Sequence, residues 1–174
     1  MNQKAFGVQS IEIGTINEST GLGESYTSVG DVYKDTAIVE EEEPTSNDHF
    51  AELKRDPVIS VVENGSETIR FDLMDAGADV LVNLLGGTAT DVVDQPDIWS
   101  KPLGHTNIEK AIRITTDDGT IFTFNRVKIM ASRNLQPTRQ GIFLVKVMGK
   151  VLTPLINDLP SVTITDNAVT NTSS

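Results

Sequence analysis

The segment IEKAIRITTDDGTIFTFNRVKIM, residues 108–130, decides the fold class because it places two strand-like stretches on either side of one tight turn. Before the turn, Ile112 and Ile114 alternate with polar residues at the period of two that is typical of a half-buried strand. The turn is Asp117-Asp118-Gly119, which tolerates the positive φ angles of a type I′ hairpin turn. The segment therefore predicts an antiparallel β-hairpin.

Alternating or continuous apolar runs predict three further strands. The full expected set is residues 57–63, 66–74, 108–116, 120–131 and 141–151. The run at 57–63 is continuously apolar, as in a strand that is buried on both faces. Asn64-Gly65 follows it directly and predicts a second hairpin turn. The strand 120–131 is expected to carry two phenylalanines on one face and two aliphatic residues on the other. These are Phe122 and Phe124, then Val127 and Ile129.

One helix is predicted, over residues 75–85. Asp75 would cap its N-terminus, and Gly86-Gly87 would end it. The apolar stripe that would pack on a sheet consists of Val80, Leu81, Leu84 and Leu85. Together these elements predict a mainly-β fold, an antiparallel β-sandwich or barrel with one short flanking helix.

Weaker patterns elsewhere set the expected domain organisation. We expect residues 1–30 to form a loosely ordered N-terminal segment, and residues 31–152 to form one β domain. An acidic loop at about residues 35–55 would protrude from this domain and become ordered on assembly. Residues 88–107 show little periodicity, and residues 153–174 would form a C-terminal tail.

Charge is segregated along the chain, whose net charge is −11. Between Glu18 and Glu52 there are ten acidic residues and one base, whereas Thr120 to Leu152 holds six bases and no acid. Two complementary docking surfaces would give this pattern, and so would two solvated faces. The assembly residues predicted from it are Glu40, Glu41, Glu42, Glu43, Arg126, Lys128, Lys146 and Lys150.

The sequence carries no pattern typical of an enzyme or a cofactor site. It has no cysteine, and His49 and His105 lack the spacing of metal ligands. P-loop and nucleophile-elbow motifs are missing. We therefore expect a protein without catalytic residues, metal or cofactor. The N-terminus lacks the apolar core of a signal peptide, and no segment reaches the roughly 20 apolar residues of a membrane helix. We expect a soluble chain without an export signal.

The order of the elements resembles the tail tube (major tail) proteins of long-tailed phages, which are related to the tube proteins of type VI secretion. The resemblance covers roughly residues 30–150. It rests on Gly30–Ala37, the acidic stretch Val39–Thr45, Asp56-Pro57-Val58, Phe71–Asp75 with the short helix after it, and Leu84–Thr88. It implies subunits that form hexameric rings and stack into a tube.

The resemblance also implies a location and partners. The subunit would lie in the virion tail, and in the bacterial cytoplasm before assembly. Its partners would be copies of itself and other tail proteins, with DNA only passing through the channel. The acidic segment Asp35–Glu52 would correspond to a long loop that reaches a neighbouring subunit.

Two alternatives remain open from the residues alone. Another virion or secretion-tube component would share the composition and the β content. A small carbohydrate-binding β-sandwich is the alternative from a different class. Such a module stacks sugars on exposed aromatic rings, for which this chain offers Trp99, Tyr26 and Tyr33.

Overall fold

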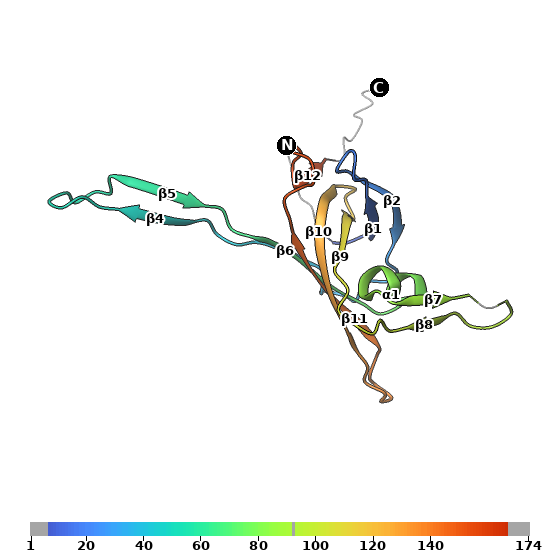
Figure 1. Ribbon diagram of the computed structural model, residues 1–174. Coiled ribbons are helices and arrows are strands. Elements are labelled where there is room, and N and C mark those ends of the chain that lie inside the picture. Colours follow the sequence, from blue (N-terminus) through green and yellow to red (C-terminus); the bar gives the residue numbers. More distant parts are fainter. Residues whose placement is uncertain (1–6, 92, 167–174) are drawn as a thin grey trace, which may run out of the picture.

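The computed structural model describes residues 7–91 and 93–166, and it has the mainly-β, antiparallel fold class that the sequence predicts (Figure 1). One helix is present in this part of the chain, α1 (Ala78–Leu85). The strands are β1 (Ser10–Ile16), β2 (Gly23–Ser28), β3 (Ile38–Glu41), β4 (Thr45–His49), β5 (Ile59–Glu63), β6 (Glu67–Leu73), β7 (Thr88–Thr90), β8 (Ile98–Ser100), β9 (Ile108–Thr115), β10 (Ile121–Asn134), β11 (Leu144–Val151) and β12 (Val162–Thr165).

The main sheet has the strand order β2-β1-β9-β10-β11-β6-β3, and β12 joins it by pairing with the first part of β10. Strands β4 and β5 pair only with each other among the described strands, as do β7 and β8. Both pairs extend from the main body as ribbons, and they leave it on opposite sides (Figure 1). Residues 88–107, which show little periodicity in the sequence, thus include two short strands, β7 and β8.

Strand β10 is 14 residues long and contains a bulge. Phe124 pairs with Ile112, but Val127 pairs with Lys110, so two residues of β10 face one residue of β9. The extra residue reverses the alternation, and Phe124, Val127 and Ile129 all lie in one core. The prediction that places these side chains on opposite faces is wrong, because a period of two cannot account for an inserted residue.

The bulge also holds the last described residues of the chain against β10. Asn125 is buried there, and its side-chain Nδ2 donates a hydrogen bond of 2.8 Å to the carbonyl oxygen of Pro160. Its backbone N–H donates to the carbonyl of Ser161 at 3.1 Å. Strand β12 follows directly, so this part of the expected C-terminal tail belongs to the main sheet. The sequence also predicts a mobile end over residues 167–174, which lies outside the described residues.

The core lies between the curled main sheet and α1. Its buried members are Ile11, Ile13, Val29, Ile69, Phe71, Leu73, Leu84, Ile112, Ile114, Phe124, Val127, Ile129, Val145 and Val147. Three of them precede residue 31, and β1 pairs with both β2 and β9. The expectation of a loosely ordered segment over residues 1–30 is therefore wrong for residues 10–29. Gly, Ser and Thr dominate the link between β1 and β2 and hide the pattern.

The turn between β9 and β10 lies where the sequence predicts it, but it is not of type I′, because Gly119 is its one residue with a positive φ. Gly119 has a φ of +86°, and its N–H donates to the carbonyl of Thr116 at 2.9 Å. The Asp118 carboxylate accepts hydrogen bonds from the hydroxyls of Thr116 and Thr120. The bond from Thr116 is the main reason why the pKa of Asp118 lies below its usual range.

Helix α1 begins later than predicted. Its N-cap is Gly77, which makes no side-chain capping bond, so the proposed cap at Asp75 is wrong. The helix ends as predicted at Gly86, whose φ of +75° suits glycine and whose N–H donates to Val82 at 2.9 Å. Leu84 is its one fully buried residue. Val80, Leu81 and Leu85 are partly buried and pack against the same core, so the predicted apolar stripe fixes the helix to the sheet.

We predict that Leu84→Ala lowers the free energy of unfolding by about 2–5 kcal/mol, because it removes a fully buried side chain and leaves a cavity. Urea unfolding followed by circular dichroism measures the loss. Asp79→Ala is the matched control on the exposed part of α1, with an expected loss below about 1 kcal/mol. Equal losses for the two variants would contradict the packing of α1 described above.

Candidate assembly surfaces

The described residues contain no cluster of three or more His, Asp or Glu side chains that is close enough to hold a metal ion. His49 lies on β4, and His105 lies beyond β8. No helix in residues 7–91 and 93–166 combines the length and apolar character needed to cross a membrane. The features that stand out are instead surfaces, namely a projecting ribbon, two sheet edges, a basic sheet face and a hollow.

Residues 42–66 form the projecting ribbon, called here the arm (Figure 1). It continues the hairpin of β3 and β6 in the same register. Glu41 faces Glu67 in the main sheet, and Thr45 faces Glu63 in the arm. Thr45 lies four residues after Glu41, and Glu63 lies four residues before Glu67, so the register is unchanged. Pro44 lies between the two ladders and has no N–H to donate, which explains the interruption.

The base of the arm is tightly packed. The Ser66 hydroxyl donates to the Glu42 carboxylate at 2.8 Å, and this bond lowers the pKa of Glu42. The Glu42 N–H in turn donates to the Ser66 carbonyl at 3.0 Å. A Cβ on Gly65 would lie 1.9 Å from the Glu42 carbonyl oxygen, so this position requires glycine.

The predicted turn at Asn64-Gly65 is therefore wrong. It was expected to join residues 57–63 to residues 66–74 as neighbouring strands, but β5 pairs with β4 and β6 pairs with β3 and β11. Strand β5 was also expected to be buried, yet every residue from 40 to 64 is exposed. A continuous apolar run is equally compatible with a buried strand and with a strand that awaits a partner.

The arm combines exposed aliphatic side chains with negative charge. Its aliphatic residues next to or on β5 are Val58, Ile59, Val61 and Val62. Its charged residues are the acids Glu42, Glu43, Asp48, Glu52, Asp56 and Glu63, and the bases Lys54 and Arg55. A ribbon of two strands with neither face covered is only marginally stable in water. The arm therefore gains stability from any surface that covers these side chains.

The predicted acidic assembly residues divide between two places. Glu40 and Glu41 lie on β3, which is an outermost strand of the main sheet, whereas Glu42 and Glu43 start the arm. Strand β2 is the other outermost strand. An exposed sheet edge offers unpaired N–H and C=O groups to a strand of another molecule.

The predicted basic residues have different roles. The Arg126 Nε donates to Glu109 at 2.7 Å, and its Nη1 donates to the Thr153 carbonyl at 3.1 Å. The hydrogen bond from the Arg126 Nε lowers the pKa of Glu109. Arg126 is thus held within the subunit. Lys128 and Lys150 are register partners on the face of the sheet away from the core, and placing like charges directly opposite each other is unfavourable.

Lys146 lies on the same face of β11 as Lys150, and its register partner on β6 is Asp72. Across the sheet, Lys150 pairs with Thr68, and Thr68 pairs with Glu40. The fold therefore brings Glu40 near the basic residues of its own subunit. Glu42, at the base of the arm, is also near them, because the charge of Lys150 contributes to its lowered pKa. The rest of the arm projects away from the main sheet (Figure 1).

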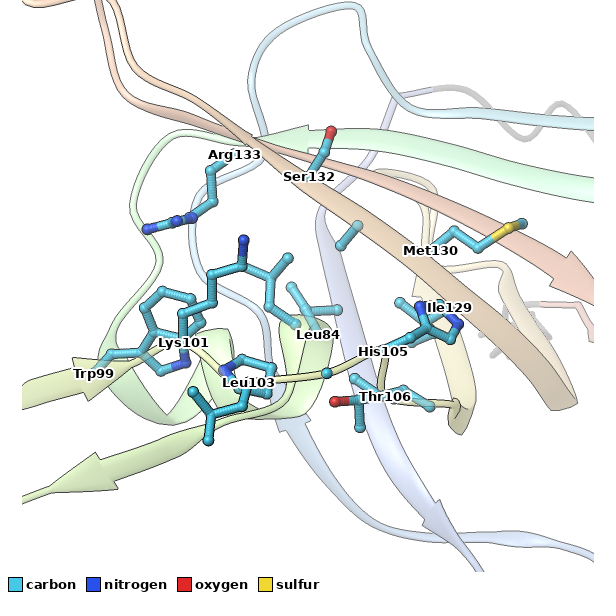
Figure 2. Close-up of a pocket in the computed structure, with 15 residues that line it drawn as sticks. Leu84, Trp99, Lys101, Leu103, His105, Thr106, Ile129, Met130, Ser132 and Arg133 are labelled. Carbon is cyan, nitrogen blue, oxygen red and sulfur yellow. The ribbon is translucent and has the colours of Figure 1, made fainter.

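A hollow of about 1060 Å³ opens where α1 and β8 leave part of the core uncovered (Figure 2). Its floor is apolar and includes Leu84, Leu85, Ile108, Ile129 and Ala131. Its cationic lining residues are Lys101 and Arg133. None of the described residues that line it is acidic. The hollow is suited to an apolar group that is accompanied by negative charge.

Trp99 organises one wall of the hollow. Its Nε1–H donates to the Gly86 carbonyl at 2.9 Å, which joins β8 to the end of α1. The Arg133 guanidinium lies 4.7 Å from the centre of its ring, within the range of a cation–π contact. Sequence reasoning missed this pair, because nothing in the sequence relates two residues that are so far apart.

A carboxylate pair lies at the edge strand. Glu67 and Glu41 are register partners, and partial burial raises the pKa of Glu67, with a further increase from the Glu41 charge. The folded protein thus binds a proton at Glu67 more tightly than the unfolded chain does. The ionised Glu67 carboxylate therefore lowers the free energy of unfolding at neutral pH. This loss of stability disappears as the pH falls below the ordinary glutamate pKa of about 4.3.

We predict that Glu67→Gln raises the melting temperature at pH 7 and has little effect near pH 3.5, below the ordinary glutamate pKa of about 4.3. Thermal unfolding of both proteins at the two pH values measures the difference. Glu43→Gln, at an exposed position of the arm, is the control. A gain in melting temperature that is independent of pH would contradict the role assigned to Glu67.

Comparison of the sequence with protein-family models gave no match. Comparison with curated protein sequences gave none either. The fold and these surfaces define a mainly-β protein with an exposed, apolar and acidic arm, and its function is argued from that geometry.

Proposed function

We propose that this chain is a structural subunit that assembles with copies of itself into rings, which stack into the tail tube of a phage or prophage. The proposal combines the resemblance of the sequence to tail tube proteins with the geometry of the arm. In that family the rings are hexameric. The subunit would lie in the virion tail after assembly and in the bacterial cytoplasm before it, with other tail proteins as further partners.

The observation that carries the proposal is the exposed aliphatic run on β5. Four β-branched side chains between Val58 and Val62 are about half exposed or more, at 46–62%. Apolar patches of this kind, surrounded by polar residues, are typical of protein interaction sites. The arm has two unpaired edges as well, so it can add to a sheet of another molecule through backbone hydrogen bonds.

The position of the arm favours an assembly that propagates. It leaves one side of the main sheet, so an arm that docks on the opposite side of a second copy makes a contact between two different surfaces (Figure 1). A contact between two different surfaces is heterologous, and it produces closed rings or open filaments. A tube of stacked rings needs both kinds of contact. The free edges of β2 and β3 supply a second pair of different surfaces.

Charge supports the same proposal. A net charge of −11 disfavours retention of DNA, which in a tube has to pass without binding to the wall. The chain would form part of the wall of the tube and would catalyse no reaction.

The carbohydrate-binding alternative receives less support from the aromatic residues. Trp99 has Arg133 above its ring, and Tyr26 has Arg113 above its ring at 3.8 Å. A sugar would have to displace an arginine to stack on either ring. Tyr33 is the third aromatic residue considered, and it is exposed. A single tyrosine is a small stacking surface for a sugar site.

We predict that the double variant Ile59→Ser, Val61→Ser reduces self-association without lowering the melting temperature of the main domain. The two side chains share one face of β5 and are exposed, so their loss affects contacts between copies and not the core. Light scattering across a concentration series, with negative-stain electron microscopy of concentrated samples, measures the assembly.

Leu155→Ser is the control for this experiment, because Leu155 is similarly exposed but lies outside the arm. Rings or tubes of the native protein and of the control, with mainly monomers of the double variant, are the expected result. If the native protein remains monomeric at every concentration, the proposed function is wrong. If the double variant assembles like the native protein, the arm is not the contact.

A further inference from the structure

The tip of the arm presents two large apolar side chains to solvent. Phe50 is 61% exposed, and Leu53 is fully exposed. The backbone N–H of Lys54 donates to the carbonyl of Ala51 at 3.1 Å, which closes a tight turn around them. Leu53 has a φ of +73°, a left-handed conformation that residues with large side chains seldom adopt. Backbone strain of this kind concentrates at functional positions.

The hollow beside Trp99 has the complementary character. Its floor is formed by aliphatic residues of α1, β9 and β10, whose apolar surface is only partly covered within the subunit (Figure 2). Lys101 and Arg133 carry positive charge at its margin, and none of the described lining residues carries negative charge. The arm carries six acids against two bases, and both bases lie at the tip, where Glu52 and Lys54 flank Leu53 in the sequence. The net charge of the arm as a whole is therefore opposite to that of the hollow, and complementary charge orients and accelerates association.

The two surfaces lie where one copy can reach another. Figure 1 shows the arm leaving one side of the main sheet and β7 and β8, next to the hollow, leaving the opposite side. The tip of the arm and the β8 strand that borders the hollow therefore lie on opposite sides of the main sheet. Repeating one contact between tip and hollow adds subunits in a single direction, as a propagating heterologous assembly requires.

We infer that the hollow is the docking site for the arm tip of a second copy of this chain, with Phe50 and Leu53 on its apolar floor and Glu52 next to Lys101 and Arg133. This inference rests on the proposed self-assembly and adds the surface that receives the arm. The contact buries apolar side chains on both partners and pairs the cations at the margin of the hollow with carboxylates of the arm.

Site-specific disulfide formation tests the contact, and the absence of native cysteines makes it unambiguous. One preparation carries Leu53→Cys and the other carries Ala131→Cys, on the floor of the hollow. The two are mixed under assembly conditions and oxidised. A disulfide forms only when the two Cα atoms come within roughly 7 Å of each other. Ile164→Cys replaces Ala131→Cys in the control, because Ile164 lies on β12, is 46% exposed and does not line the hollow.

The expected result is a dimer cross-linked between Leu53→Cys and Ala131→Cys, with little product from the Ile164→Cys mixture. Equal yields in the two mixtures, or no product in either mixture while the native protein assembles, would overturn the inference and leave the proposed function intact. No assembly of the native protein would overturn both.

A second variant tests the contact without using the hollow. Leu53→Asp should weaken assembly by about tenfold or more, which corresponds to about 1.4 kcal/mol, because it places a charge on the apolar floor. Leu53 is fully exposed, so the fold of the monomer is unaffected. Val93→Asp is the control, since Val93 is 85% exposed and lies outside both the arm and the hollow. Assembly of Leu53→Asp at the native level would contradict the inference.

Discussion

The pairing of β10 with three other strands is the constraint on which the rest of the fold depends. Its first part lies between β9 and β12, and its second part lies between β9 and β11. The bulge between Phe124 and Val127 keeps the apolar side chains of both parts in one core. The same bulge binds the segment before β12 through Asn125. Removing this strand would separate β1, β2 and β9 from β11, β6 and β3.

The arm follows from a local interruption of this well-paired sheet. Strands β3 and β6 continue into β4 and β5 in one register, but Pro44 and the close approach of Gly65 to Glu42 break the ladder between them. Beyond that point the two strands have no third neighbour among the described residues. The aliphatic side chains of β5 therefore stay exposed, in contrast to those of β6 and β11, and β4 is polar throughout and cannot cover them. For β5 the difference from a core strand is one of position.

The regular parts of the fold could be predicted from the sequence because their signals are local. Alternating residues in β6, β9 and β11, the Asp117–Gly119 turn and the stop of α1 at Gly86 all act within a few residues. The bulge in β10 and the partner of β5 could not be predicted. The first depends on an inserted residue, and the second on whether β5 pairs with the strand before it, β4, or with the strand after it, β6.

The surfaces were predictable only in part. Glu40–Glu43 could be placed at an edge by their charge, and the structure has Glu40 and Glu41 on the edge strand β3. The segregation of charge along the chain did not reveal that Arg126 is engaged by Glu109, or that Glu40 lies across the sheet from Lys150. The hollow brings Trp99 and Arg133 together from separate strands, so only the folded chain shows it.

Hydrogen exchange of the arm amides, in the dilute monomer and in the assembled protein, tests most directly whether the arm finds its partner in another copy. In the monomer the amides of residues 45–63 should exchange quickly, because a two-stranded ribbon without a covered face opens readily. On assembly their exchange should slow by about tenfold or more, whereas the amides of β10 should change little. Equally fast exchange of the arm in the two states, or strong protection already present in the monomer, would contradict the account.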